Sequence, residues 1–72
     1  MPEKAFETEN LKVYERSAGI WTVEDKKGAN VIGEIQVHGY DVVFDSFFNE
    51  FTRPELLELA EAVQRVGNIS PK

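Results

Sequence analysis

The chain contains no cysteine among its 72 residues. It therefore forms no disulfide, offers no thiolate ligand to a metal and has no thiol nucleophile. Such a composition suits the reducing cytoplasm, where we expect the protein. No apolar run approaches the roughly 18 residues that a membrane-spanning helix needs. The opening stretch MPEKAFETEN is charged and lacks the apolar core of an export signal, so we expect neither export nor a membrane partner.

Basic residues are scarce. Eight lysines and arginines stand against 13 aspartates and glutamates, which gives a net charge of −5. Proteins that bind nucleic acids usually gather lysine and arginine into a patch that neutralises phosphates, and here only Lys26 and Lys27 are adjacent. We therefore expect no direct nucleic-acid binding. The acidic surface is explained by solubility, and the alternative is a carboxylate surface that imitates a nucleic acid and occupies a basic site.

Residues with catalytic or metal-binding chemistry are also few. His38 is the only histidine, and across a tight turn it would face Asp41, which is typical of an exposed ion pair rather than of a general base without a pocket. Glu34, Asp41 and Asp45 could gather on one sheet face, but they lack the spacing of a calcium loop. The glycines form no phosphate-binding motif. We expect no catalytic residue, no metal and no cofactor, and hence no enzyme.

The composition, 42% hydrophobic and 29% charged, predicts a single small globular domain over residues 1–72. A chain of this length buries only about 60% of its unfolded surface, so it must use its apolar residues efficiently. Residues 1–9 and 68–72 are expected to be loosely ordered ends.

The segment TRPELLELAEAVQRVG predicts a helix. Thr52 and Glu55 match a capping box, and Phe51 with Leu56 matches the hydrophobic staple that often precedes a helix. Gly67 is expected to end the helix in a left-handed conformation. The apolar stripe at helical spacing consists of Leu56, Leu59, Ala60, Val63 and Val66. The opposite face carries Glu58, Glu61 and Arg65.

Upstream, residues 11–44 alternate apolar and polar side chains and are interrupted by glycines, which predicts antiparallel strands joined by hairpin turns at SAG, KKG and HGYD. The turns imply a register in which the cross-strand pairs are Val13–Val23, Val23–Val31, Trp21–Gly33, Ile35–Phe44 and Val37–Val42. This register places one apolar set on one face: Leu11, Val13, Trp21, Val23, Val31, Ile35, Val37, Val42 and Phe44.

Together these elements predict an α+β fold with two layers, a four-stranded antiparallel β-meander and one C-terminal α-helix on its inner face. The alternative is a small SH3-like barrel with the helix at its mouth.

The outer face of the predicted sheet carries a connected apolar stripe. Phe47 extends this stripe, whereas Phe48 is assigned to the junction between sheet and helix. Connected exposed apolar residues are typical of a protein-binding surface, although the N-terminal segment could instead cover them with Phe6. The predicted partner-binding residues are Tyr14, Ile20, Ile32, Val43 and Phe47.

The function that this sequence favours is that of a small acidic, non-enzymatic interaction module: an adaptor, regulator or inhibitor of another protein. One alternative is a homodimer or assembly subunit that uses the exposed sheet face or an edge strand. The other is the acidic mimic of a nucleic acid described above. The chain resembles no family by its motifs.

Overall fold

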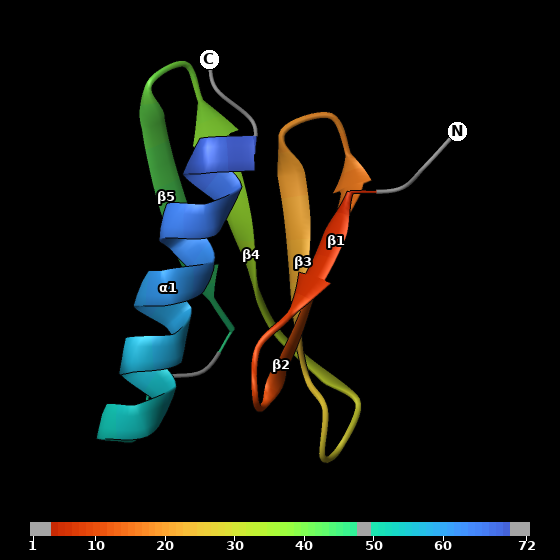
Figure 1. Cartoon of the computed structure of the whole chain (residues 1–72), viewed down its shortest axis with the longest axis vertical. Helices are drawn as coiled ribbons and strands as arrows, with labels where there is room; N and C mark the ends of the chain where they lie inside the picture. Colours follow the sequence, from red (N-terminus) through yellow and green to blue (C-terminus); the bar gives the residue numbers. More distant parts are fainter. Residues whose placement is uncertain (1–3, 48–49, 70–72) are drawn as a thin grey trace.

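A computed structural model describes residues 4–47 and 50–69 as an α+β fold, in which one helix packs on one face of an antiparallel sheet (Figure 1). Phe48, which we assigned to the sheet–helix junction, lies outside the described residues. The elements are β1 (Ala5–Glu7), β2 (Leu11–Ser17), β3 (Ile20–Asp25), β4 (Asn30–His38), β5 (Asp41–Ser46) and α1 (Arg53–Ile69).

The sheet has five strands rather than the four predicted, in the order β1-β2-β3-β4-β5. The additional strand is β1, which comes from the segment expected to be a loose end and pairs antiparallel with β2. Phe6 of β1 stands opposite Val13, so its ring joins the inner face, where its centroid lies 6.1 Å from that of the Trp21 ring, with the two rings tilted by 46°. The described sheet is open, with β1 and β5 at its edges, rather than closed into the alternative barrel.

The predicted register of the β4–β5 hairpin is confirmed, since Val37 pairs with Val42. In the β2–β3 hairpin the predicted pair Val13–Val23 is confirmed, but the register shifts at Arg16, so that Ser17 of the predicted SAG turn stands opposite Ile20. The last turn has two residues and begins with Gly39 at φ 61°, a left-handed conformation that glycine adopts without a steric penalty.

The predicted register between β3 and β4 is wrong by up to two residues. Val23 pairs with Gly33 and Glu24 with Val31, because Ile32 is an extra residue on β4 that forms a β-bulge. The turn is also longer than expected, and its left-handed residue is Ala29, at φ 56°, rather than Gly28. The bulge exposes Val31, which is 39% accessible, and turns Ile32 toward the core.

The cap of α1 is confirmed. The backbone N–H of Thr52 donates to Oε1 of Glu55 at 2.7 Å, and the N–H of Glu55 donates to Oγ1 of Thr52 at 3.4 Å. Phe51 packs edge-on against Phe44, while Leu56, its predicted staple partner, is 54% exposed. The helix does not end at Gly67 as predicted but continues to Ile69.

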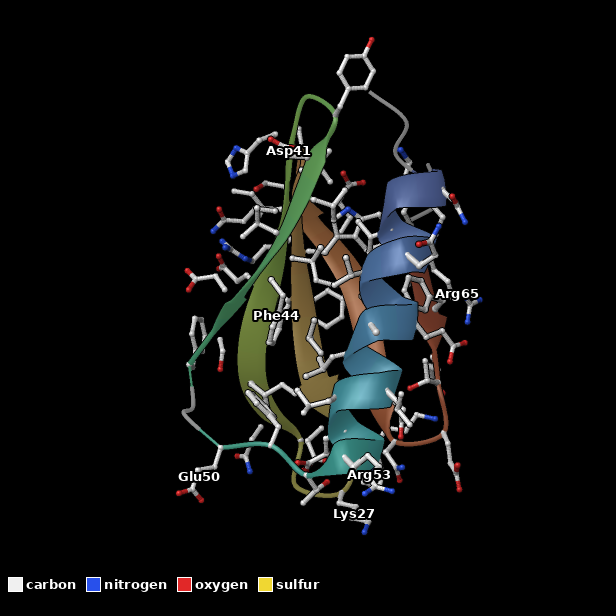
Figure 2. The ribbon with its side chains drawn as sticks, turned by 90° about the vertical axis from the view of Figure 1, so that its left-hand side faces the viewer. Lys27, Asp41, Phe44, Glu50, Arg53 and Arg65 are labelled. Carbon is white, nitrogen blue, oxygen red and sulfur yellow. The ribbon has the colours of Figure 1, made fainter. Side chains whose placement is uncertain are left out.

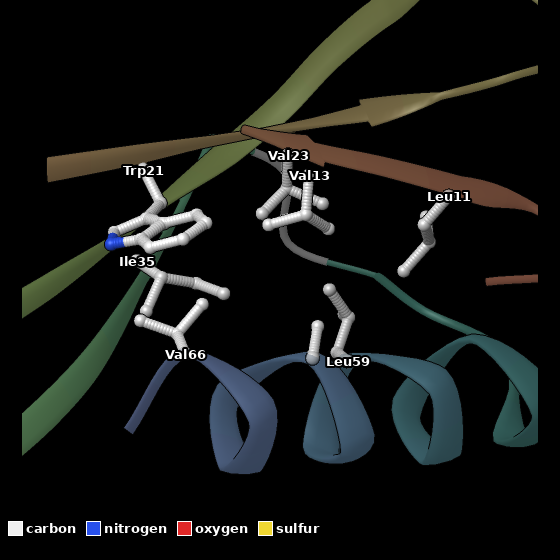
Figure 3. Packing of buried hydrophobic residues seen from close by; sticks show 8 residues of the cluster. Leu11, Val13, Trp21, Val23, Ile35, Leu59 and Val66 are labelled. Carbon is white, nitrogen blue, oxygen red and sulfur yellow. The ribbon is translucent and has the colours of Figure 1, made fainter. Parts of the chain in front are cut away.

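The core lies between the sheet and one side of α1 (Figure 3). The helix contributes a narrower stripe than the sequence predicts, and Ala62 is buried in place of Ala60. The buried apolar residues are Leu11, Val13, Trp21, Val23, Ile35, Leu59, Ala62 and Val66.

Candidate protein-interaction surface

The five predicted partner-binding residues do not form one connected patch. Ile32 packs against the core, where the bulge of β4 places it. Tyr14 pairs with Thr22, and the next residue in that row is Glu34 rather than Ile32. The remaining three, Ile20, Val43 and Phe47, stay on or near the outer face. Partner binding by individual members of this set stays a prediction.

A chain of polar contacts occupies much of the outer face. Nη2 of Arg16 lies 2.5 Å from Oε2 of Glu34, and Gln36 donates to the other carboxylate oxygen of Glu34 at 3.4 Å. Tyr14 donates its hydroxyl to Oε2 of Glu24 at 2.5 Å, and this hydrogen bond raises the pKa of Tyr14 above its usual value. Side chains engaged with one another in this way are less available to a partner.

His38 stands opposite Asp41 in the register, as predicted, but its ring nitrogen Nε2 contacts Oε1 of Gln36 at 3.0 Å. The ring is exposed, and no nucleophile is hydrogen-bonded to it among the described residues. Residues 4–47 and 50–69 also contain no group of three or more histidines and carboxylates placed to hold a metal.

A pocket of about 220 Å³ opens where the start of α1 meets the turns of the sheet. Leu11, Ile32, Phe51 and Leu59 form its apolar lining. Two of its carboxylates already have structural partners: Glu55 closes the helix cap, and Glu58 binds the turn between β1 and β2. The volume is below the range of about 300 to 1,000 Å³ that is usual for small-molecule sites.

Glu58 connects α1 to the β1–β2 turn. Its carboxylate accepts hydrogen bonds from the Thr8 hydroxyl, from the Asn10 backbone N–H at 3.0 Å and from Asn10 Nδ2 at 2.6 Å. The Thr8 hydroxyl, followed by the Asn10 donors, holds the pKa of Glu58 below its usual value. On the same side of the helix, the Arg65 guanidinium lies 4.4 Å from the ring centroid of Phe6. This side of α1 is therefore occupied by β1 and the turn after it.

The other side of α1 faces β5 and retains exposed apolar residues. At about 100° per residue, Leu56, Ala60, Val63 and Gly67 follow one another along this side, which we call the α1 flank. The C-terminal end of this flank lies against β5, because a Cβ added to Gly67 would lie 3.4 Å from Cγ2 of Val42. Leu56 is 54% exposed and Ala60 is exposed as well. The helix glutamates Glu55, Glu58 and Glu61 all lie outside this flank.

The strand beside this flank, β5, is an edge of the sheet (Figure 1). His38 and Asp41 flank a two-residue turn and therefore exchange backbone hydrogen bonds with each other. From there, every second residue of β5 bonds to β4 through its backbone, as far as Phe47, whose N–H donates to Ile32 O at 3.0 Å. The residues between these pairs, Val42 and Phe44, direct their N–H and C=O groups away from β4. We call this row the β5 edge.

Phe44 of the β5 edge has its side chain on the inner face of the sheet, where it packs against the core. Its ring lies on the face of the sheet that α1 covers (Figure 2), leans over Gly33 of β4 and is half-buried. The ring centroid is 6.1 Å from that of Phe51, in an edge-on arrangement. Sequence reasoning placed Phe44 in the core and missed the flank as an exposed surface. The sequence contains one indication of the flank, the width of the apolar stripe on the helix. Leu59 and Val66 are buried against the sheet, and Leu56 and Ala60 lie to one side of them around the helix axis.

Comparison of the chain with models of protein families, with curated proteins and with solved structures gives no match. In the described part of the chain, no helix is long and apolar enough to cross a membrane.

Proposed function

We propose that this chain is a small, non-enzymatic protein-interaction domain that acts as an adaptor, regulator or inhibitor by occupying a surface of another protein. One observation supports the proposal above others: an apolar helix flank without acidic residues lies beside an open strand edge, on a chain whose net charge is −5. Burial of uncharged apolar surface is the main favourable contribution to protein association, and the cores of interfaces are depleted in charged residues. The proposal includes a cytoplasmic location, which the lack of cysteine favours.

The test compares two neighbouring leucines on α1. Leu56 lies on the flank and is 54% exposed, whereas Leu57 points about 100° further round the helix and is 66% exposed. Leu56→Glu puts a charge into the proposed interface, and Leu57→Glu makes the same chemical change on the solvent side. Both positions are exposed, so we expect both variants to fold.

The immobilised wild-type protein and each variant are used to capture proteins from a cell lysate, at low and at high salt. We expect a set of proteins that the wild type and Leu57→Glu retain and that Leu56→Glu loses, and this retention should survive high salt in part. A set that all three proteins retain, and that high salt removes, would instead support binding through acidic surface charge, as in a nucleic-acid mimic.

A further inference from the structure

We propose that the β5 edge accepts an extended segment of the partner protein as a sixth, antiparallel strand, and that this segment carries basic residues at both ends of an apolar centre. The inference rests on the proposed function and supplies the binding mode and the chemistry of the partner. Addition of a strand to an open sheet edge is a common mode of peptide recognition, in which backbone hydrogen bonds give affinity and alternate side chains give specificity.

The backbone of β5 provides the first requirement. Val42 and Phe44 present their N–H and C=O groups to the side on which no described strand lies. An antiparallel segment would pair one residue with each of them through two hydrogen bonds. Within the described residues the opposite edge of the sheet offers less, because β1 spans three residues there, Ala5–Glu7.

The inner face beside β5 provides an apolar cover. Neighbouring strands lie about 4.8 Å apart, while a helix with its side chains is about 10 to 12 Å wide. A helix that packs on β5 and β4 therefore extends past β5 toward the place of the next strand. Side chains of the added segment on this face would lie beside Ala60 and Val63, the part of the α1 flank that adjoins Gly67 and Val42. Both positions that face the flank should therefore be apolar.

The outer face of β5 determines the charge of the segment. Asp41, Val43 and Asp45 alternate along it, and all three are exposed. Neither aspartate forms an ion pair within residues 4–47 and 50–69. Opposite charges directly across two strands stabilise the pair, and like charges destabilise it. The positions opposite the two aspartates should therefore be lysine or arginine, with an apolar residue between them opposite Val43.

The same charges disfavour a second copy of this chain as the occupant. Pairing of β5 with β5 of another copy would bring two further aspartates to the outer face of the new ladder. The sequence of β5, DVVFDS, contains no basic residue that would offset them. The pattern complementary to β5 in the added segment is basic, apolar, apolar, apolar, basic. This pattern is the same in either chain direction.

The probe is a capped peptide containing Lys-Ile-Val-Ile-Lys, compared with the peptide Glu-Ile-Val-Ile-Glu, with binding measured by fluorescence anisotropy at low salt. We expect the wild-type protein to prefer the lysine peptide. Asp45→Lys should lower the affinity for the lysine peptide by about fivefold and raise the affinity for the glutamate peptide. Glu9→Lys, the matched control, makes the same change in net charge at an exposed residue away from β5 and should leave the preference unchanged. Equal effects of the two variants would overturn the pairing of Asp45 with a partner cation.

Methylation of peptide nitrogens tests the strand pairing itself. In the antiparallel arrangement the two isoleucines point their N–H groups at Val42 and Phe44, and the central valine points its N–H away. N-methylation of the isoleucines should abolish binding, and N-methylation of the valine should leave it within about twofold. Binding that tolerates methylated isoleucines would overturn strand addition.

Failure of this inference and failure of the proposed function are distinguishable. If Leu56→Glu loses captured proteins that Leu57→Glu retains, while the lysine peptide does not bind, the proposed function stands and strand addition is wrong. If neither effect occurs, both are wrong. Light scattering during size-exclusion chromatography should show a monomer, and a dimer that Leu56→Glu dissociates would replace the basic segment with a second copy as the occupant.

Discussion

Oε2 of Glu58 on α1 lies 2.6 Å from Nδ2 of Asn10 in the turn between β1 and β2. With the Thr8 hydroxyl and the Asn10 N–H on the other carboxylate oxygen, this contact attaches the helix to the β1–β2 hairpin. It also fixes the orientation of α1 about its own axis. Glu58 and Arg65 are held toward β1, so the α1 flank is turned toward β5 and the open edge.

The first prediction concerns this attachment. Glu58→Gln should lower the free energy of unfolding by about 1 kcal/mol at neutral pH, because the donors of Thr8 and Asn10 lose a charged acceptor. Glu61→Gln is the matched control, since among the described residues Glu61 forms an exposed ion pair with Arg65 at 3.7 Å and no other ion pair. Urea unfolding measures both. Equal losses in the two variants would mean that Glu58 contributes no more than an exposed charge.

The pH dependence of stability follows from the same site. Hydrogen bonds hold the pKa of Glu58 in the folded protein below its usual value of 4.5. A carboxyl whose pKa is lowered by folding stabilises the folded state above its unfolded pKa, and this stabilisation is lost as the pH falls through the folded pKa. The difference in stability between wild type and Glu58→Gln should therefore be full at about pH 7 and small at about pH 3. A difference that stays constant over this range would contradict the assignment.

Ala29 is expected to weaken the fold. It is the one described residue other than glycine with a positive φ, 56°, where an L side chain costs roughly 1 to 2 kcal/mol. Ala29→Gly should therefore raise the free energy of unfolding by up to about 1 kcal/mol after the entropy cost of glycine. Ala18→Gly, in the turn between β2 and β3, relieves no such strain and should be neutral or destabilising. Thermal melts of the two variants provide the comparison.

Gly33 should not tolerate a side chain. A Cβ at this position would lie 2.7 Å from the carbonyl oxygen of Asp45 and 2.7 Å from Cε1 of Phe44. Gly33→Ala should cost about 1 to 3 kcal/mol, because the backbone of β5 and a packed ring must both move. Gly28→Ala is the control: the atom close to its Cβ is Nδ2 of the Asn30 side chain, at 2.6 Å, and this side chain can rotate away. Gly28→Ala should therefore lower the free energy of unfolding less than Gly33→Ala. If denaturant titration shows equal losses, the close packing of β4, β5 and Phe44 is wrong.

Substitutions on the buried side of α1 should affect stability more than substitutions on the α1 flank. Leu59 is 4% exposed, so Leu59→Ala should lower the free energy of unfolding by about 2 to 4 kcal/mol. Leu56→Ala should lower it by less than about 1 kcal/mol. Chemical denaturation ranks the two substitutions. The reverse ranking would place Leu56 in the core and leave no apolar flank.

The hairpin turns explain which parts of the fold were predictable. At HGYD the sequence allows one short turn, and the register from Val37–Val42 to Ile35–Phe44 followed correctly. At KKG, Gly28 suggested the left-handed position, but the chain uses Ala29 and compensates with a bulge at Ile32. Both registers place Val23 inward, so the apolar alternation could not choose between them.

The candidate site was less predictable than the fold, because it depends on which part of a wide apolar stripe the sheet buries. Leu56, Ala60 and Val63 have the spacing of a core-facing stripe, and so do Leu59, Ala62 and Val66. Periodicity gives equal support to either set. The choice is made by long-range contacts, above all those of Glu58 and Arg65 with the β1–β2 hairpin. No local pattern reports such contacts.

Amide hydrogen exchange at Val42 and Phe44 tests most directly that this protein binds through the β5 edge. In the free protein these two amides should exchange faster than that of Val43, which bonds to β4. With the Lys-Ile-Val-Ile-Lys peptide bound, exchange at Val42 and Phe44 should slow, and exchange at Tyr14 and Ile20 on the outer face should not change. Slower exchange at Tyr14 and Ile20, with Val42 and Phe44 unaffected, would contradict the account and return the binding site to the outer face of the sheet.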